Sequence, residues 1–146
     1  MAGWRRVVVC SLVALLLPIL HHAPAYAAAV LGRVVAIADG DTLTVLTEER
    51  QQVKVQLSDI DTPESAQPYG TRARQERSDL AFGRNARVEV RETDRYGRTV
   101  GRVHVGDMDV NAEMVRRGAA WVYRRYSHDP GLLAVEREAQ SARRGL

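Results

Sequence analysis

The sequence predicts an α+β protein built on a five-stranded Greek-key β-barrel with about three helices. Five short runs of β-favouring residues are separated by turn signals. One helical segment follows the third run, and two more come near the end of the chain. The length of 146 residues suits a single domain with one hydrophobic core.

The start of the chain has the layout of a removable secretory signal. Arg5-Arg6 gives a positive start, the run Val7–Leu20 is largely apolar, and Ala25-Tyr26-Ala27 fits a cleavage site. The apolar run is short for a membrane span, and an uncleaved anchor is the alternative. We therefore expect a signal at 1–27 and one domain at 28–146. The domain would be exported, either to a periplasm or out of the cell, without a stable membrane span.

Cysteine content and charge limit the chemistry that we expect of residues 28–146. Cys10 is the only cysteine and would leave with the signal, so neither a disulfide nor a thiolate metal site is expected. Removing Arg5 and Arg6 leaves a nearly balanced charge, which makes global charge weak evidence for nucleic-acid binding. Lys54 is the only lysine, and arginine is used at the other Lys/Arg positions. The planar guanidinium of arginine binds phosphate in bidentate fashion. A GC-rich genome is the simpler explanation for that bias.

The first three strands set up the most useful structural prediction. They are expected at 30–38, 42–47 and around 53–57, with a tight turn at Asp39-Gly40. The second and third strands form a hairpin that folds near Glu49–Gln51. Positions equidistant from that fold lie opposite one another. Asp41 should therefore lie close to the segment Asp59–Asp61.

The remaining elements complete the barrel. A helix is expected at Thr71–Phe82, with Thr71 as its cap and Gly83 at its end. Further strands contain Val88 and Val90, and then Val100 to Val105, around a charged turn at Asp94–Arg98. A short helix capped by Asp109 and a last helix beginning at Asp129-Pro130 follow. This order of elements fits a barrel of the oligonucleotide-binding (OB) type.

The stretch Asp59-Ile60-Asp61-Thr62-Pro63-Glu64 concentrates three carboxylates in six residues. Like charges that close repel one another. A bound cation or a general base in an unusual setting would explain why the chain keeps them together. A solvated acidic turn is the alternative for this stretch alone.

Several motifs in order resemble the staphylococcal nuclease (thermonuclease) family. They are Asp39-Gly40-Asp41-Thr42, Asp61-Thr62-Pro63-Glu64, Asp94-Arg95-Tyr96-Gly97-Arg98 and the segment from Val110 to Tyr123. The resemblance covers about Gly32 to Leu146. Each motif alone is weak, whereas all of them in order and at this spacing are specific.

The resemblance implies an OB-fold barrel and a calcium-dependent phosphodiesterase that acts on DNA and RNA with little sequence preference. It implies Ca²⁺ ligands at Asp41, Asp61 and the backbone carbonyl of Thr62, and it gives Glu64 the place of the general base. It also implies that Arg98 binds the phosphate and assists the leaving group. Tyr96 and Tyr123 match positions around the nucleotide, although core or rim packing is the simpler role for Tyr123. The expected products carry a 3′-phosphate, and the chain is expected to be a monomer that prefers single-stranded or open regions.

One position departs from the family pattern. Five residues before Asp61, where the family has a second phosphate-gripping arginine, this chain has Gln56. Glutamine can donate hydrogen bonds but carries no charge. Lys54 lies two residues away on the same face of the strand and could substitute in part as a point charge. Two rivals to a nuclease therefore stay open: a non-catalytic module that binds nucleic acid or a protein, and a structural envelope protein.

Overall fold

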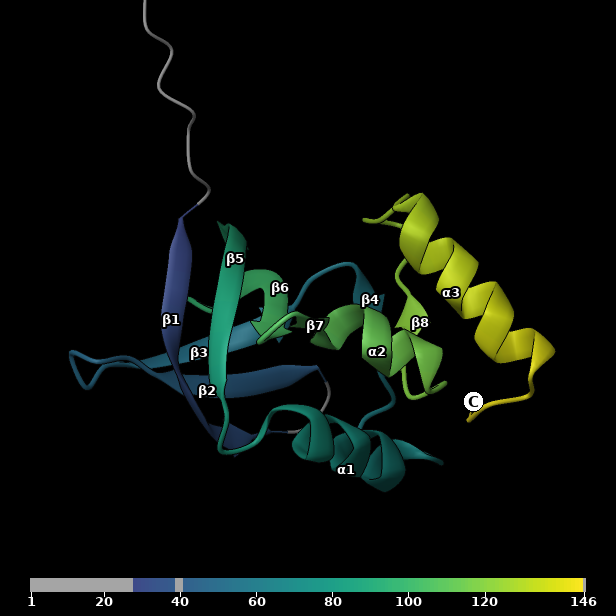
Figure 1. Ribbon diagram of the computed structural model, residues 1–146, viewed down its shortest axis with the longest axis horizontal. Coiled ribbons are helices and arrows are strands. Elements are labelled where there is room, and N and C mark those ends of the chain that lie inside the picture. The colour runs from purple at the N-terminus through teal and green to yellow at the C-terminus, as the bar shows by residue number, and fades with distance from the viewer. Residues whose placement is uncertain (1–27, 39–40, 146) are drawn as a thin grey trace, which may run out of the picture.

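The computed structural model describes residues 28–38 and 41–145 of the chain. Both the predicted signal and the predicted turn at Asp39-Gly40 lie outside these residues. Five strands wrap into a closed barrel in the order β3-β2-β1-β5-β6, and a parallel pairing of β3 with β6 completes it (Figure 1). The strands are β1 (Ala29–Ile37), β2 (Thr42–Leu46), β3 (Gln52–Leu57), β5 (Asn85–Thr93) and β6 (Thr99–Val105). The predicted five-stranded barrel is confirmed.

Three short strands were not predicted. β4 (Ile60–Asp61) pairs antiparallel with β8 (Trp121–Val122), outside the barrel sheet, and β7 (Met108–Asp109) pairs with the end of β6. Each contains two residues, which is too short for an alternating pattern to show in the sequence. The β4–β8 pair matters for function because it fixes Asp61 opposite Trp121.

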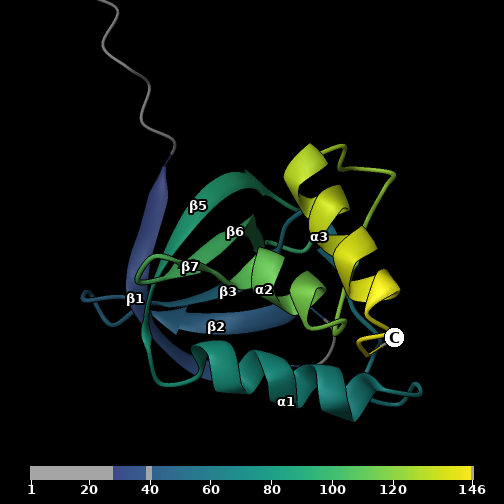
Figure 2. The ribbon, with the colours of Figure 1, turned by 45° about the vertical axis from the view of Figure 1, so that its right-hand side comes forward.

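The chain has three helices in the described residues, as predicted. They are α1 (Gly70–Ala81), α2 (Val110–Arg116) and α3 (Pro130–Ser141), and α1 and α2 pack against the barrel. In Figure 2, α1 runs beneath the barrel, and α3 lies on the far side of α2 from the strands. The predicted caps of the second and third helices are present. The Asp109 carboxylate accepts a hydrogen bond from the N–H of Ala112, and that of Asp129 accepts from Gly131 and Leu132.

The predicted cap of the first helix is wrong. The N-cap position is Tyr69, in a left-handed conformation with φ of 67°, and no side chain caps the helix. Thr71 lies inside the first turn and is exposed. The predicted inward residues are correct, since Ala73, Leu80 and Ala81 are buried.

The core follows the alternation of the strands. Leu43 and Val45 of β2 and Val55 and Leu57 of β3 are buried, whereas Thr44, Lys54 and Gln56 between them are partly or fully exposed. The outward face of β3 carries Gln56 toward the end of the barrel where β6 begins. Asp41, just before β2, and Arg98, just before β6, contact residues at this same end of the barrel.

Within residues 28–38 and 41–145, no helix has the length and apolar character needed to cross a bilayer.

Candidate active site

The hairpin of β2 and β3 brings the first predicted acid to the second acidic segment. Thr42 pairs with Gln56, and the N–H of Leu57 donates to the carbonyl of Asp41 at 3.0 Å. The Gln56 side chain donates from Nε2 to Oδ2 of Asp41 at 2.8 Å. Asp41 therefore lies where the sequence placed it, at the end of the hairpin.

Asp41 lies near a second carboxylate, that of Asp61, and we call this pair the acidic corner. Burial raises the pKa of Asp41 above its ordinary value. The hydrogen bond from Gln56 offsets part of that rise, the neighbouring Asp61 carboxylate adds to it, and Arg98 counteracts it. The two carboxylates thus lie close enough to repel, and a cation between them would stabilise their ionised forms.

Asp61 and Thr62 are held at the edge of the barrel by the β4–β8 pair. Oδ1 of Asp61 accepts a hydrogen bond from the N–H of Thr62 at 2.9 Å. The Thr62 side chain is buried, and its hydroxyl oxygen has no hydrogen-bond partner in the part of the chain that the structure describes. A buried polar atom without a partner is unusual and marks a site that a ligand or water can complete.

The donor set fits a hard cation in its chemistry. Asp41, Asp61 and the Thr62 carbonyl offer oxygen atoms alone, which Ca²⁺ prefers. Among residues 28–38 and 41–145, no group of three or more His, Cys, Asp or Glu side chains is arranged to hold a metal ion. Two carboxylates and a carbonyl would leave several calcium positions for water and a substrate phosphate.

Glu64 lies on an exposed loop between β4 and α1. Its backbone N–H donates to Oε1 of Gln67 at 2.7 Å, and its carbonyl accepts from the N–H of Gln67 at 2.8 Å. Gly70 packs directly on this loop, since a Cβ there would stand 1.8 Å from the Glu64 carbonyl oxygen. The Glu64 carboxylate makes no hydrogen bond or ion pair to another described residue. The loop is thus held by its backbone while the carboxylate stays open to solvent.

Arg98 is fixed by the turn that precedes β6. Asp94 accepts hydrogen bonds at Oδ1 from the N–H groups of Tyr96 and Arg98, and at Oδ2 from Nε of Arg98 at 2.7 Å. Gly97 has φ of 79°, a conformation that glycine adopts without strain. Nη1 of Arg98 donates a hydrogen bond to the Thr42 hydroxyl oxygen at 3.3 Å. The arginine therefore points back toward the strand that follows Asp41.

A hollow of about 900 Å³ opens beside these residues. Its lining includes Gln56, Tyr96, Arg98 and Tyr123 from the predicted set. Tyr123 meets Tyr126 edge to face, with ring centroids 4.9 Å apart. Asp41, Asp61, Thr62, Glu64 and Lys54 do not line this hollow. Gln56 joins the two parts of the site, because it lines the hollow and is bonded to Asp41.

Lys54 is separated from the hollow. It pairs with Thr44 on β2 and its side chain is exposed. The hollow begins two residues further along β3, at Gln56. The geometry therefore gives no support to Lys54 as a substitute for the arginine absent at position 56.

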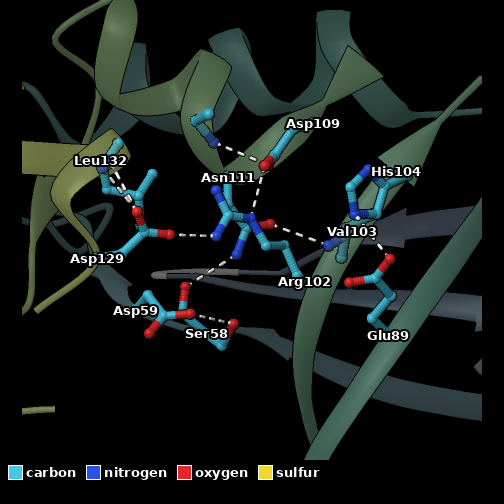
Figure 3. Close-up of polar contacts among 12 residues, drawn as sticks. Ser58, Asp59, Glu89, Arg102, Val103, His104, Asp109, Asn111, Asp129 and Leu132 are labelled. Atoms are coloured by element: carbon cyan, nitrogen blue, oxygen red, sulfur yellow. Dashed lines mark hydrogen bonds and ion pairs between the residues drawn. The ribbon is translucent and has the colours of Figure 1, made fainter. Parts of the chain in front are cut away.

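Two supporting residues were not found from the sequence. Asn111, fully buried at the start of α2, donates from Nδ2 to the Ser58 carbonyl and accepts at Oδ1 from the N–H of Val103 (Figure 3). Glu136 of α3 is also buried and accepts from the N–H of Val122 at 2.9 Å. Asn111 holds the segment leading to Asp61, and Glu136 holds β8 beside it. A polar residue on a helix gives no sequence signal that it will be buried.

Taken together, the fold and site define an OB-barrel protein with an acidic corner beside a hollow lined by arginine and tyrosine. Residues 54–146 match the family model described as "Staphylococcal nuclease homologue". This match spans more than half of the chain. The chain therefore belongs to the staphylococcal nuclease family.

Individual relatives agree with the family match. A protein named "Uncharacterized endonuclease" from Haemophilus influenzae is 44% identical over 114 residues, which cover 78% of this chain and 64% of that protein. A "Micrococcal nuclease" from Shigella flexneri is 45% identical over 126 residues, covering 79% of this chain and 72% of the relative. A plant relative, "Probable staphylococcal-like nuclease CAN1" from Oryza sativa subsp. japonica, is 38% identical over 96 residues, covering 66% of this chain and 29% of that protein.

Proposed function

We propose that this protein is a calcium-dependent nuclease that hydrolyses phosphodiester bonds of DNA and RNA. The observation that carries the proposal is the meeting of two features at Gln56. On one side lie the carboxylates of Asp41 and Asp61, and on the other lies the hollow that contains Arg98 and three tyrosines. An acidic corner beside a guanidinium suits a phosphodiester, which needs both a cation and hydrogen-bond donors.

The metal would be held by Asp41, Asp61 and the Thr62 carbonyl. When bound there, Ca²⁺ supplies positive charge against the phosphate oxygens as negative charge develops on them. The raised pKa of Asp41 is consistent with a site that is more stable with a cation than without one.

The protein's own residues have distinct roles in the proposed reaction. Glu64, on its solvent-facing loop, takes a proton from a water molecule whose oxygen bonds to phosphorus. Arg98 donates hydrogen bonds to the phosphate, and its orientation is fixed by Asp94. The bond from phosphorus to the 5′ oxygen breaks, that oxygen takes a proton from solvent, and the phosphate stays on the 3′ side.

Tyr96, Tyr123 and Tyr126 give the hollow its aromatic surfaces. All three rings are exposed, and the Arg98 guanidinium lies 5.6 Å from the centre of the Tyr96 ring. Exposed rings beside a cation suit unstacked bases, so we propose a preference for single-stranded or open regions. Stacking reads no base edge, which is consistent with little sequence preference.

The test is digestion of single-stranded DNA, double-stranded DNA and RNA by the purified chain without residues 1–27. We expect cleavage in calcium that stops on chelation and returns when calcium is restored. Glu64→Gln should reduce turnover by about 10²–10⁴-fold. The matched control is Glu48→Gln, an exposed acid in the β2–β3 turn. Cleavage that persists in chelator, or that survives in Glu64→Gln, would contradict the proposed mechanism.

A second candidate is a nucleic-acid-binding module with weakened catalysis. It is favoured by Gln56, whose amide carries no charge and is engaged with Asp41. Oligonucleotide binding without cleavage, at equal affinity in the wild type and in Glu64→Gln, would support this candidate over the nuclease.

Export and monomeric state are also proposals. Export rests on the sequence features of residues 1–27 and predicts a shortened, periplasmic or secreted form in cells. Size-exclusion chromatography with light scattering would test the monomer.

A further inference from the structure

Three arginines line the hollow beside the acidic corner: Arg91, Arg95 and Arg98. Two of them are engaged within the protein. Arg98 is bonded to Asp94, and Arg95 donates to the Tyr96 hydroxyl at 2.6 Å while its guanidinium lies 4.7 Å from the centre of that ring.

Arg91 is much less constrained. The one ion pair of its side chain in the described part of the chain is with Oδ2 of Asp59 at 4.0 Å, which is too long for a hydrogen bond. The side chain is 57% exposed. An exposed pair at this distance contributes little energy. The donors of this guanidinium are therefore available to a ligand in the hollow.

The backbone explains why Arg91 faces the hollow. Val90 pairs with Gly101 and Glu92 with Val100, so Arg91 is the extra residue of a β-bulge in β5. A bulge re-aims the side chain at its position. Val100 also pairs with Gln56 across the β3–β6 seam. Arg91 and Gln56 thus reach the same hollow from strands on either side of β6.

We propose that Arg91 is a phosphate-binding residue of this site, and that its guanidinium adds to those of Arg95 and Arg98 in the hollow. This proposal rests on the proposed function and names a substrate contact within it. Gln56 brings no charge, and Lys54 does not reach the hollow, whereas Arg91 lines it. A backbone phosphate of a single strand would replace the long contact to Asp59 with charge-assisted hydrogen bonds.

Asp59 and Glu92 also line the hollow, so a strand must approach against their charge. Removing Arg91 takes one positive charge from a hollow that these acids also line, so its contribution to binding should be measurable. The expected loss is about tenfold in affinity, the size of one hydrogen bond to a charged group.

The test is fluorescence anisotropy of a labelled single-stranded oligonucleotide in calcium across a range of salt concentrations. The parent protein carries Glu64→Gln so that the strand stays intact. Adding Arg91→Ala should weaken binding about tenfold at low salt and flatten the plot of log K against log salt by about 0.7, as for one phosphate contact. Arg91→Lys should keep the slope and lose part of the affinity.

Arg87→Ala is the matched control, because Arg87 is an outward arginine of the same strand that lies off this hollow and pairs with Glu89 at 2.8 Å. Its slope and affinity should stay near those of the parent. An unchanged slope in Arg91→Ala, or an equal loss in Arg87→Ala, overturns the inference and leaves the nuclease proposal standing. No binding by the parent together with no cleavage by the wild type overturns both. Thermal unfolding of each variant confirms that the exposed substitutions leave the fold intact.

Discussion

Gln56 donates a hydrogen bond to Asp41 at 2.8 Å, across the end of the β2–β3 hairpin. The amide therefore orients a proposed calcium ligand and also forms part of the wall of the hollow. Because the Gln56 amide is uncharged, its hydrogen bond competes only weakly with a cation for the Asp41 carboxylate. The amide leaves the hollow with one positive charge fewer than an arginine at the same position would provide.

Replacing Gln56 with arginine should raise the turnover rate. The planar fork can bond Asp41 with one nitrogen and reach a phosphate with another. We expect kcat to rise about 10- to 100-fold. Removing one transition-state donor typically costs about 10²–10³ in rate, so this gain is at or below that size. Steady-state kinetics in saturating calcium measure it, with Gln52→Arg at the exposed start of β3 as control. If kcat does not rise and Lys54→Ala abolishes activity, lysine has taken over the role.

Gly70→Ala should lower both the activity and the stability of the protein. A Cβ at this position would stand 1.8 Å from the Glu64 carbonyl oxygen, so the loop carrying Glu64 must move. Displacing a catalytic group by about 1 Å can cost roughly 100-fold in rate. We expect kcat to fall about 10- to 100-fold, with a loss of about 1–3 kcal/mol in the free energy of unfolding.

The control for this prediction is Thr71→Ala, the next residue of α1, which is exposed and does not cap the helix. Both variants are compared by kinetics and urea denaturation. Wild-type kcat in Gly70→Ala would show that the position of the Glu64 loop is unimportant for turnover.

Elements of this fold could be predicted where the interacting residues lie close together in the sequence. Alternation in β3 and the turn near Glu49 are local signals, and they were enough to bring Asp41 to the acidic segment. The β4–β8 pair joins residues about sixty positions apart through two-residue strands, and no local pattern encodes it. The start of α1 was misjudged because Thr71 has a capping side chain, whereas the chain enters the helix through Tyr69.

The sequence predicted only those site residues whose role follows from their residue type and local spacing. Paired acids and the turn around Arg98 stand out in the sequence. Arg91 does not, because its direction depends on a bulge that appears only when β5 is paired with β6. Asn111 was likewise invisible, since its role depends on two backbone groups from other elements.

Asn111→Ala should strongly destabilise the protein. Its amide satisfies the Ser58 carbonyl at 2.9 Å and the Val103 N–H at 3.0 Å, and the side chain is fully buried (Figure 3). Alanine leaves both backbone groups without partners, at a cost of about 1–3 kcal/mol each. We expect urea denaturation to show a loss of about 2–5 kcal/mol, against almost none for Gln140→Ala on the exposed face of α3. A loss below about 1 kcal/mol would mean that water replaces the amide.

Asp129→Asn should make the protein less stable at neutral pH, with a difference that shrinks in acid. Arg102 bridges the caps of two helices, donating to Asp109 at 2.6 Å and to Asp129 at 2.7 Å (Figure 3). The hydrogen bond from Arg102 lowers the pKa of Asp129 below its ordinary value. A carboxylate whose pKa is lower in the folded state contributes stability above its unfolded pKa, and loses that contribution as pH falls through the folded value.

Asparagine can still cap α3 through its side-chain oxygen, so the substitution removes the charge and spares the cap. We expect a loss of about 1 kcal/mol at pH 7, decreasing below about pH 4. Urea denaturation from pH 7 to pH 3 measures it. Asp107→Asn, at an exposed turn carboxylate with no ion pair among the described residues, should track the wild type. A deficit in Asp129→Asn that stays constant with pH would show that the cap, and not the ion pair with Arg102, carries the effect.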